Sequence, residues 1–478
     1  MLWACVLLPQ LALDGVLRRH PQPEQPLALV TGPAQKRSLA AVNCAAVRAG
    51  LHAGQALAAA HALLPQFATV EYDATEVARW RDFLAAWAYR YSSQVAIAAF
   101  NGIAGDAIVL EIQSSLSLFG PWPAFERQLR EDLTALGFSH RIAVAPNARA
   151  AWVLAGVHDG MAITHAPTLD TALSRIPVAH ARLEAKTARA LHAMGLRRLG
   201  QLFAAPRASL GKRFGTELLD HLDRLRGNIP DPFALYCPPD RFDLRIELAF
   251  DVESSQALLF PLRRMTADLA AYLAGRDGGV QRFVVHLEHE GHVDTEVVVG
   301  LLAAERDPAL LFELARSRLE QARTPAPTRG MRLVAEQLPP FVPAGRELFE
   351  DRPAQAVPWD TLRERLRACL GDDAVYALAP VQDHRPELAW RRASMPSPPK
   401  SPVETSPRPT WLLPGPMPLR DHAPHVLAGP ERVESGWWDG GDVRRDYYVV
   451  ETSNGQRAWA FRPAGDADGP FMLHGWFA

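Results

Sequence analysis

The chain has few cysteines and no long apolar run. The four cysteines among its 478 residues, Cys5, Cys44, Cys237 and Cys369, lie far apart and form no C-x-x-C pair. This pattern argues against a zinc site or a disulfide framework and fits a reducing compartment. No run reaches the ~18 apolar residues of a membrane span, and no Lys or Arg precedes the apolar residues 2–13 as in a secretion signal. We therefore expect a cytoplasmic protein with no membrane partner.

An excess of charge of either sign is also absent. The 51 Lys and Arg residues nearly balance the 53 Asp and Glu residues, so the formal net charge is −2. Binding to nucleic acid would therefore depend on local basic patches. A hydrophobic share of 48% is that of an ordinary globular protein, and the length corresponds to roughly three or four domains.

Strand and helix patterns alternate over the first 155 residues, which indicates an α/β layer structure. The pattern turns helical over residues 183–227, and residues 244–336 follow the order βαββαβ of a compact α+β domain. Six prolines in residues 395–409 predict an extended linker, and the aromatic, turn-rich residues 411–478 predict a small β-rich module. The expected strands are 27–30, 107–112, 140–145, 244–250, 280–289, 295–301 and 330–336, and the expected helices are 77–91, 123–136, 147–155, 256–273, 308–321 and 359–370.

Residues 41–54 carry a motif that holds Asn43, Ala46, Gly50 and Gly54 at fixed spacing. It resembles the fingers motif N-Y-E-A-R-x-x-G-[VI]-x-x-G-M of the Y-family (translesion) DNA polymerases. The sequences Tyr-Ser-Ser-Gln-Val at 91–95 and Leu-Phe-Gly at 118–120 are similar to that family's palm, and residues 142–151 are similar to its G-I-[SG]-x-N-K-x-L-A-K segment. The resemblance implies a right-hand fold with palm, fingers, thumb and little finger.

The residues with which that family performs catalysis are replaced here. The resemblance assigns two magnesium ions to an Asp of the first strand and to an acidic pair, and it assigns the incoming triphosphate to a Tyr, an Arg and a Lys. The matching positions are Cys5, Asp106 and Ala107 for the metal ligands, and Cys44, Val47 and Ala148 for the triphosphate contacts. Two-metal phosphoryl transfer needs several carboxylates, and phosphate recognition needs charge-assisted donors. The sequence therefore predicts a polymerase-like scaffold that is not an enzyme and binds no metal or cofactor.

Residues 191–206 have the helix–hairpin–helix form, with a glycine turn between two helices. In this form the amide N–H groups at the start of the second helix face a DNA phosphate. Residues 182–226 also hold ten Lys or Arg against four Asp or Glu. We expect DNA binding through Gly195, Arg197, Arg198, Lys212 and Arg213, although a plain helical packing domain would share the form.

The βαββαβ segment resembles the Y-family little finger, which grips DNA. Between positions 240 and 336, however, sixteen acidic residues outnumber twelve arginines. Any DNA contact is therefore expected on a local face, around Arg263, Arg264 and Arg282.

Three segments approach the loose form Q-L-x-L-F or Q-x-x-L-F of a sliding-clamp peptide. Residues 115–119 fit in their letters but belong to the palm, and residues 337–341 keep the Gln but lose the Leu. Residues 345–349 lose the Gln but lie in a proline-flanked stretch after the little finger. Leu-Phe pairs are common by chance, and position favours Leu348 and Phe349 as the clamp-binding residues.

The tail is rich in paired aromatic residues beside Gly and Asp. Residues 429–449 and 473–478, together with residues 380–390, resemble the bacterial ImuB family of Y-family-like proteins. Such aromatics can form a small core, but in a module behind a flexible linker they also suit a partner surface. The residues that we assign to partner binding are Trp437, Trp438, Tyr447, Tyr448 and Trp476.

The ImuB resemblance implies an adaptor in DNA-damage-induced mutagenesis. Such a protein binds DNA and links the sliding clamp to a RecA-like ImuA protein and an error-prone C-family DNA polymerase. Two alternatives stay open: an active translesion polymerase with diverged ligands such as Asp14, Asp106 and Glu111, or a DNA-binding scaffold that never touches the clamp. The joint loss of metal and triphosphate contacts favours the adaptor.

The expected fold class is α+β multidomain, a Y-family-like right hand followed by a β-rich tail module. The expected domains are a palm at 1–165 with fingers inserted at about 15–75, a thumb at 166–235, a little finger at 240–340, a linker at 341–410 that holds the clamp peptide, and a partner-binding module at 411–478.

Overall fold

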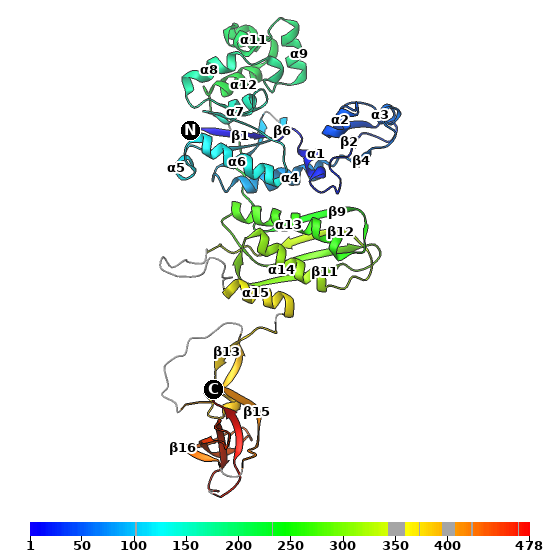
Figure 1. The fold of residues 1–478 in the computed structure, drawn as a ribbon. Coiled ribbons are helices and arrows are strands. Elements are labelled where there is room, and N and C mark those ends of the chain that lie inside the picture. The colour runs from blue at the N-terminus through cyan, green and yellow to red at the C-terminus, as the bar shows by residue number, and fades with distance from the viewer. Residues whose placement is uncertain are drawn as a thin grey trace. The chain divides into compact units, whose positions relative to one another are not determined.

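The computed structural model describes residues 1–100, 103–231, 233–342, 359–371, 373–393, 407–421, 424–466 and 468–478. It separates into two compact units, Met1–Ala368 and Cys369–Ala478 (Figure 1). The first unit mixes helices and sheets, and the second is built mainly of β-strands.

A five-stranded sheet in the order β5-β6-β1-β7-β8 forms the palm of the first unit. The central strand β1 (Trp3–Leu7) is antiparallel to both β6 (Ile103–Glu111) and β7 (Arg141–Ala145). Strands β5 (Val95–Phe100) and β8 (Met161–Ala162) form the edges. Successive side chains of a strand point to opposite faces, and all five residues of β1 are buried. Both faces of the sheet are therefore covered.

Helices on the two faces separate the palm core into two clusters. On one face, α4 (Ala74–Ala88) and α6 (Trp122–Leu136) bury Val6 and its neighbours. On the other face, α7 (Ala148–Ala155) covers Cys5 and its neighbours. The shorter palm helices are α1 (Leu11–Leu17) and α5 (Leu116–Phe119).

A separate three-stranded sheet, in the order β3-β2-β4, lies within the range expected for the fingers. Strand β2 (Leu27–Thr31) is antiparallel to β3 (Ser38–Val42) and parallel to β4 (Ala68–Glu71). Helices α2 (Cys44–Arg48) and α3 (Leu57–Leu63) pack on it around a small core of Ala, Val and Leu side chains.

The thumb is helical, as the sequence predicts. Gly195 and Gly215 adopt positive φ angles and separate its successive helices. Apolar thumb side chains such as Leu191 and Leu222 join the core cluster under α7. The thumb helices are α8 (Ala166–Ser174), α9 (Ala185–Ala193), α10 (Leu199–Ala204), α11 (Arg207–Phe214) and α12 (Thr216–Arg226).

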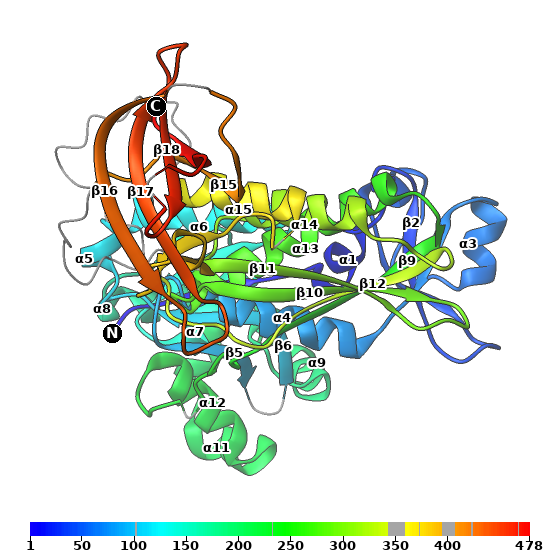
Figure 2. The ribbon, with the colours of Figure 1, turned by 90° about the horizontal axis from the view of Figure 1, so that it is seen from below.

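The little finger has the predicted βαββαβ order, which is confirmed. Its strands form an antiparallel sheet in the order β11-β10-β12-β9, with the two helices along one face (Figure 2). Leu269 and Leu314 of the helices share a buried cluster with Phe283 of the sheet. The elements are β9 (Phe242–Val252), α13 (Ser255–Gly275), β10 (Val280–His289), β11 (Thr295–Glu305), α14 (Pro308–Gln321) and β12 (Thr328–Ala335).

The palm and the little finger share one hydrophobic core. Buried residues of α4, such as Trp80 and Leu84, belong to the same cluster as Leu262 of α13. At Gly275, a Cβ atom would collide with the carbonyl oxygen of Ala86. Only glycine therefore allows the end of α13 to approach the backbone of α4 so closely.

The second unit contains a hairpin and a five-stranded antiparallel sheet. The hairpin pairs β13 (Ala377–Pro380) with β14 (Trp390–Ala393). The large sheet has the order β15-β19-β18-β17-β16. Its strands are β15 (Trp411–Pro418), β16 (His425–Ser435), β17 (Val443–Glu451), β18 (Arg457–Pro463) and β19 (Met472–Trp476).

Two expectations about organisation need correction. The hairpin β13–β14 lies inside residues 341–410, where we expect a linker, and the division of the chain falls after Ala368. The sequence pattern also misses β3, β4 and β5. Strands β3 (Ser-Leu-Ala-Ala-Val) and β5 (Val-Ala-Ile-Ala-Ala-Phe) are short and rich in alanine, which has a low β-propensity and blurs the alternation that marks a strand.

Candidate functional site

The centre of the palm sheet is apolar where the Y-family resemblance places acidic residues. Leu7 of β1 pairs with Ala107 of β6, and Cys5 pairs with Val109. Leu7 is 8% exposed and the other three are fully buried. This register corrects the assignment of the first metal position, because Leu7, and not Cys5, lies opposite the Asp106–Ala107 pair. Magnesium requires oxygen ligands, which neither Leu nor Cys offers.

The thiol of Cys5 is sealed within this core. Burial raises its pKa far above the usual range, so the thiol stays protonated and unreactive. Nearby, Arg182 adopts a φ of 55° and places its guanidinium 4.7 Å from the ring centroid of Trp152 on α7. Trp152 belongs to the same buried cluster as Cys5 and the thumb residues Leu169 and Leu199. Helix α7 and the thumb therefore fill the space over this face of the sheet.

The carboxylates of the polymerase alternative are not brought together. Asp14 accepts hydrogen bonds from the amide (2.8 Å) and the hydroxyl (3.2 Å) of Ser139. Glu111 accepts one from the hydroxyl of Ser114 at 2.8 Å. Burial raises the pKa of both Asp14 and Asp106. Within the described parts of the chain, no three His, Cys, Asp or Glu side chains are grouped so that they could hold a metal ion.

The residues kept from the Y-family motifs shape the backbone. Asn43 caps α2, and Asn147 caps α7, each by accepting an amide hydrogen bond from the first turn. Cys44 and Val47 are exposed on α2, whereas Ala148 is buried at the start of α7. The three positions expected for triphosphate contacts therefore carry no charged side chain, and only two of them face solvent.

The thumb hairpin satisfies its own amides. The N–H groups of Arg197 and Arg198 both donate to the side-chain oxygen of Gln201, at 2.7 and 3.0 Å. The N–H of Leu199 donates to a carbonyl of the segment before α9. These amides therefore do not point freely at a phosphate, contrary to the expectation for the turn at Gly195. A Gln three residues into a helix is a known capping signal, and the sequence could have indicated this arrangement.

Basic side chains of the thumb nevertheless remain available. Other thumb arginines are neutralised, since Arg207 pairs with Asp223 and Arg226 pairs with Asp170. Six exposed basic residues have no carboxylate partner within the described residues, and we call them the thumb basic surface: Lys186, Arg189, Arg197, Arg198, Lys212 and Arg213.

The basic face expected on the little finger is not assembled. Arg264 donates to the carbonyl of Leu136 in the palm, and Arg263 lies 4.7 Å from the ring centroid of Phe312. Of the three residues named from the sequence, only Arg282 belongs to the sheet. Other arginines of the sheet are paired with carboxylates: Arg245 with Glu288 and Arg332 with Asp243.

Two of the three candidate clamp peptides are packed onto the first unit. Phe119 of the first candidate stacks on a ring of α6, with centroids 4.8 Å apart. The amide of Phe341, in the second candidate, donates a hydrogen bond to the carbonyl of Asp277 in the little finger. The ring centroid of Phe341 lies 4.2 Å from the guanidinium carbon of Arg306. The third candidate, Leu348 and Phe349, lies outside the described residues.

The aromatic residues of the tail divide into two kinds. Trp437 is 76% exposed and Trp438 is 59% exposed. Tyr448 and Trp476 are half-buried, and Tyr447 is 1% exposed at the centre of a ring stack. The assignment of Tyr447 to partner binding is therefore wrong, because its ring belongs to the core of the module.

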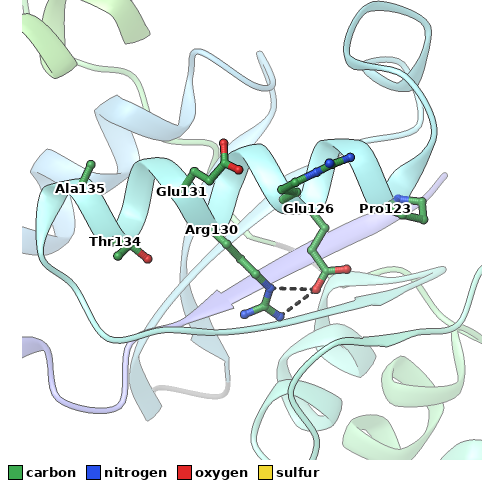
Figure 3. A pocket seen from close by; sticks show the side chains of 7 residues that line it. Pro123, Glu126, Arg130, Glu131, Thr134 and Ala135 are labelled. Atoms are coloured by element: carbon green, nitrogen blue, oxygen red, sulfur yellow. Dashed lines mark hydrogen bonds and ion pairs between the residues drawn. The ribbon is translucent and has the colours of Figure 1, made fainter.

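A shallow depression lies along the outer side of α6, between Pro123 and Ala135 (Figure 3). Its main polar group, Arg130, is held by Glu126 and by Asp159, each at 2.7 Å. The depression is lined by residues of a single helix, and its arginine Arg130 is already engaged by two carboxylates.

Several known proteins are similar to this chain. Residues 14–156 match the impB/mucB/samB family. The chain is 29% identical over 466 residues to Protein ImuB of two Caulobacter vibrioides strains, a match that covers 90% of this chain and 100% of the relative. Among solved structures, DinB from Sulfolobus solfataricus is 15% identical with a TM-score of 0.40, covering 72% of this chain and 100% of that one. An insertion ternary complex of Dbh DNA polymerase is 14% identical with a TM-score of 0.41, covering 71% and 99%.

The match to the impB/mucB/samB family falls on the palm and the inserted three-stranded sheet of this α+β fold. The likeness to Protein ImuB, which covers 90% of this chain, reaches well beyond that region. Among the described helices, none is both long and apolar enough to cross a membrane.

Proposed function

We propose that the chain is a non-catalytic, Y-family-like adaptor in DNA-damage-induced mutagenesis. It binds DNA in the cytoplasm and links the sliding clamp to an error-prone C-family polymerase and a RecA-like ImuA protein. One observation carries the proposal: Leu7 and Ala107 pair in a buried apolar centre, beside the buried Cys5, where an active enzyme needs carboxylates. Two metal ions cannot be held there, so phosphoryl transfer has no site.

DNA binding is assigned to the thumb basic surface. Because the hairpin amides are already bonded to Gln201 and to Ile176, the phosphates are contacted by Lys and Arg side chains. Such contacts depend on salt and are nearly independent of sequence. The arginines of the little finger that are paired with carboxylates add little to the attraction for DNA phosphates.

Support for the partners comes from the ImuB likeness, which spans both units of the chain. The exposed Trp437 and Trp438 suit a partner surface in the second unit. Leu348 and Phe349 are assigned to the sliding clamp, since the other two candidate peptides are packed onto the first unit.

Primer extension with the full-length protein tests the loss of catalysis. We expect no template-dependent synthesis with either magnesium or manganese. Asp106→Ala serves as the control, because Asp106 is the one acidic residue left at the expected metal positions. Synthesis that disappears in this variant would overturn the proposal and favour an active polymerase.

The adaptor role is tested by separate capture of the clamp, the ImuA protein and the C-family polymerase on the full-length chain. We expect all three to bind. A chain that binds DNA but none of the three would instead be a DNA-binding scaffold.

A further inference from the structure

The most exposed aromatic pair of the second unit sits on a short turn between two long strands. Residues Gly436–Gly441, here called the tryptophan turn, join β16 to β17. Trp437 and Trp438 meet edge to face, with ring centroids 5.6 Å apart and planes at 85°. Large aromatic side chains left this open to water are unusual unless they serve an interaction.

A nearly buried arginine fixes this turn. The side chain of Arg385 is 6% exposed and donates to both carboxylate oxygens of Asp439, at 3.0 and 2.5 Å. It also donates to both oxygens of Asp383, at 3.1 and 2.8 Å, and to the carbonyl of Gly441 at 3.3 Å. The guanidinium carbon lies 6.0 Å from the ring centroid of Trp438.

The glycines of the turn make this approach possible. A Cβ atom on Gly441 would lie 2.7 Å from a terminal nitrogen of Arg385, and a Cβ atom on Gly436 would collide with the carbonyl oxygen of Gly441. Gly436 also has a φ of 87°, which favours glycine. The guanidinium and the glycines together hold the two indoles in one geometry before any partner arrives, and this lowers the entropic cost of binding.

The charges around the turn select the class of partner. Arg385 is shared by two carboxylates and Arg444 faces a third, so the ion pairs of the turn leave an excess of negative charge. The acidic residues are Asp383, Glu434, Asp439 and Asp442, and the basic residues are Arg385 and Arg444. Exposed indoles can stack on nucleic-acid bases, but a net negative surround repels phosphates. The same surround favours a protein surface that is rimmed by Lys and Arg.

We propose that the tryptophan turn is the docking element of the second unit and that Arg385 positions it. Its occupant is a folded protein that offers an apolar pocket with a basic rim. This inference rests on the proposed function, in which the chain recruits protein partners, and it names the residues and the chemistry of one such contact.

The test measures binding of the full-length chain to the ImuA protein and to the C-family polymerase, each as a separate probe. Trp437→Ala with Trp438→Ala should weaken binding to at least one of them by on the order of tenfold or more. Trp411→Ala is the matched control, since Trp411 is 68% exposed in the same unit, and it should change nothing. Binding through the turn should also weaken as salt rises.

A double-mutant cycle tests the role of Arg385. Arg385→Lys keeps the charge but cannot bridge two carboxylates, so it should weaken binding. Its effect should add little to that of Trp438→Ala, because both act through the turn. Full additivity of the two effects would overturn the positioning role. If Arg385→Lys unfolds the module, the exposed tryptophan variants still decide whether the turn docks.

The results distinguish a failure of the proposed recruitment role from a failure of the tryptophan turn as its docking element. If the unaltered chain binds neither protein, the recruitment role falls and this inference falls with it. If the unaltered chain binds but the double tryptophan variant binds equally well, only this inference is overturned. Binding of a single-stranded oligothymidylate that is lost in Trp438→Ala would also overturn it, in favour of a nucleic-acid surface.

Discussion

Arg18 and Asp268 form a two-point ion pair between segments 250 residues apart in sequence. Their side chains are 2% and 1% exposed, and the closest nitrogen and oxygen are 2.6 Å apart. The guanidinium carbon also lies 4.6 Å from the ring centroids of both Trp80 and Phe138. Because Arg18 follows α1 and Asp268 lies on α13, the pair fixes the little finger to the palm.

Removing one member of this pair should be costly. Asp268→Ala leaves the guanidinium of Arg18 buried without a counter-charge, which costs about 3–5 kcal/mol. Arg207→Ala removes an ion pair whose arginine side chain is 58% exposed and should cost at most about 1 kcal/mol. Native-state hydrogen exchange of α13 peptides measures both effects. If Asp268→Ala lowers stability no more than Arg207→Ala does, the ion pair does not hold the little finger on the palm.

Local patterns were enough to predict several helices of the chain, but not the contact between Arg18 and Asp268. The bounds of α14 and of α15 (Trp359–Leu370) were predicted to the residue, because a 3.6-residue apolar period and, for α14, a Pro near the start mark them clearly. The contact between Arg18 and Asp268 depends on how the chain folds back, which no sequence period records. The pattern of residues 244–336, in contrast, correctly predicted the order of elements in the little finger.

Binding of DNA should depend on the thumb basic surface. Replacing Arg197, Arg198, Lys212 and Arg213 together by Ala should weaken binding and flatten the dependence of log K on log salt. Each lost phosphate contact reduces the slope by about 0.9. Fluorescence anisotropy with a primer–template at several salt concentrations measures this slope.

A neutral control exists on the same helices. Arg207→Ala with Asp223→Ala removes a paired arginine and its carboxylate together, so the thumb keeps its net charge and the slope should not change. An unchanged slope in the fourfold variant would move the DNA contact to another part of the chain.

The site residues were predicted less well than the fold, and for a common physical reason. Tyr447 resembles Trp437 in the sequence, since both stand among aromatic and charged neighbours. Only the strand register decides that Tyr447 points into the ring stack of the module, opposite Phe461. The amides of the thumb hairpin likewise look free unless Gln201, three residues into α10, is recognised as a capping residue.

Stability should fall in mild acid because of a buried histidine. Burial and the neighbouring Arg149 lower the pKa of His221 from 6.5 to about 4. One ring nitrogen faces Arg149 at 2.8 Å and the other faces the carbonyl of Ala181 at 2.9 Å, so the folded state holds the neutral ring. The unfolded chain binds a proton near pH 6.5, so stability is full above that pH and decreases as the pH falls toward 4.

The full loss amounts to roughly 3 kcal/mol, from 1.36 kcal/mol for each unit of pKa. Thermal unfolding of the full-length protein at pH 5 and pH 7.5 measures the part of this loss that has developed by pH 5, about 2 kcal/mol. His221→Asn keeps an acceptor for Arg149 but does not titrate, so its stability should depend less on pH, although its overall stability is lower. An equal pH dependence in the variant would assign the effect to other groups.

Clamp binding should depend on two residues. Short peptides concentrate their affinity in a few anchors, so Leu348→Ala with Phe349→Ala should abolish binding to the sliding clamp while folding and DNA affinity stay unchanged. Leu118→Ala is the matched control, because Leu118 belongs to the palm segment that fits the clamp form in its letters and is 79% exposed. Surface plasmon resonance on immobilised clamp measures the binding of each variant.

If the double variant binds the clamp as well as the unaltered chain does, residues 337–341 become the better candidate. If it unfolds instead, the Leu-Phe pair is a packing element and not a clamp peptide.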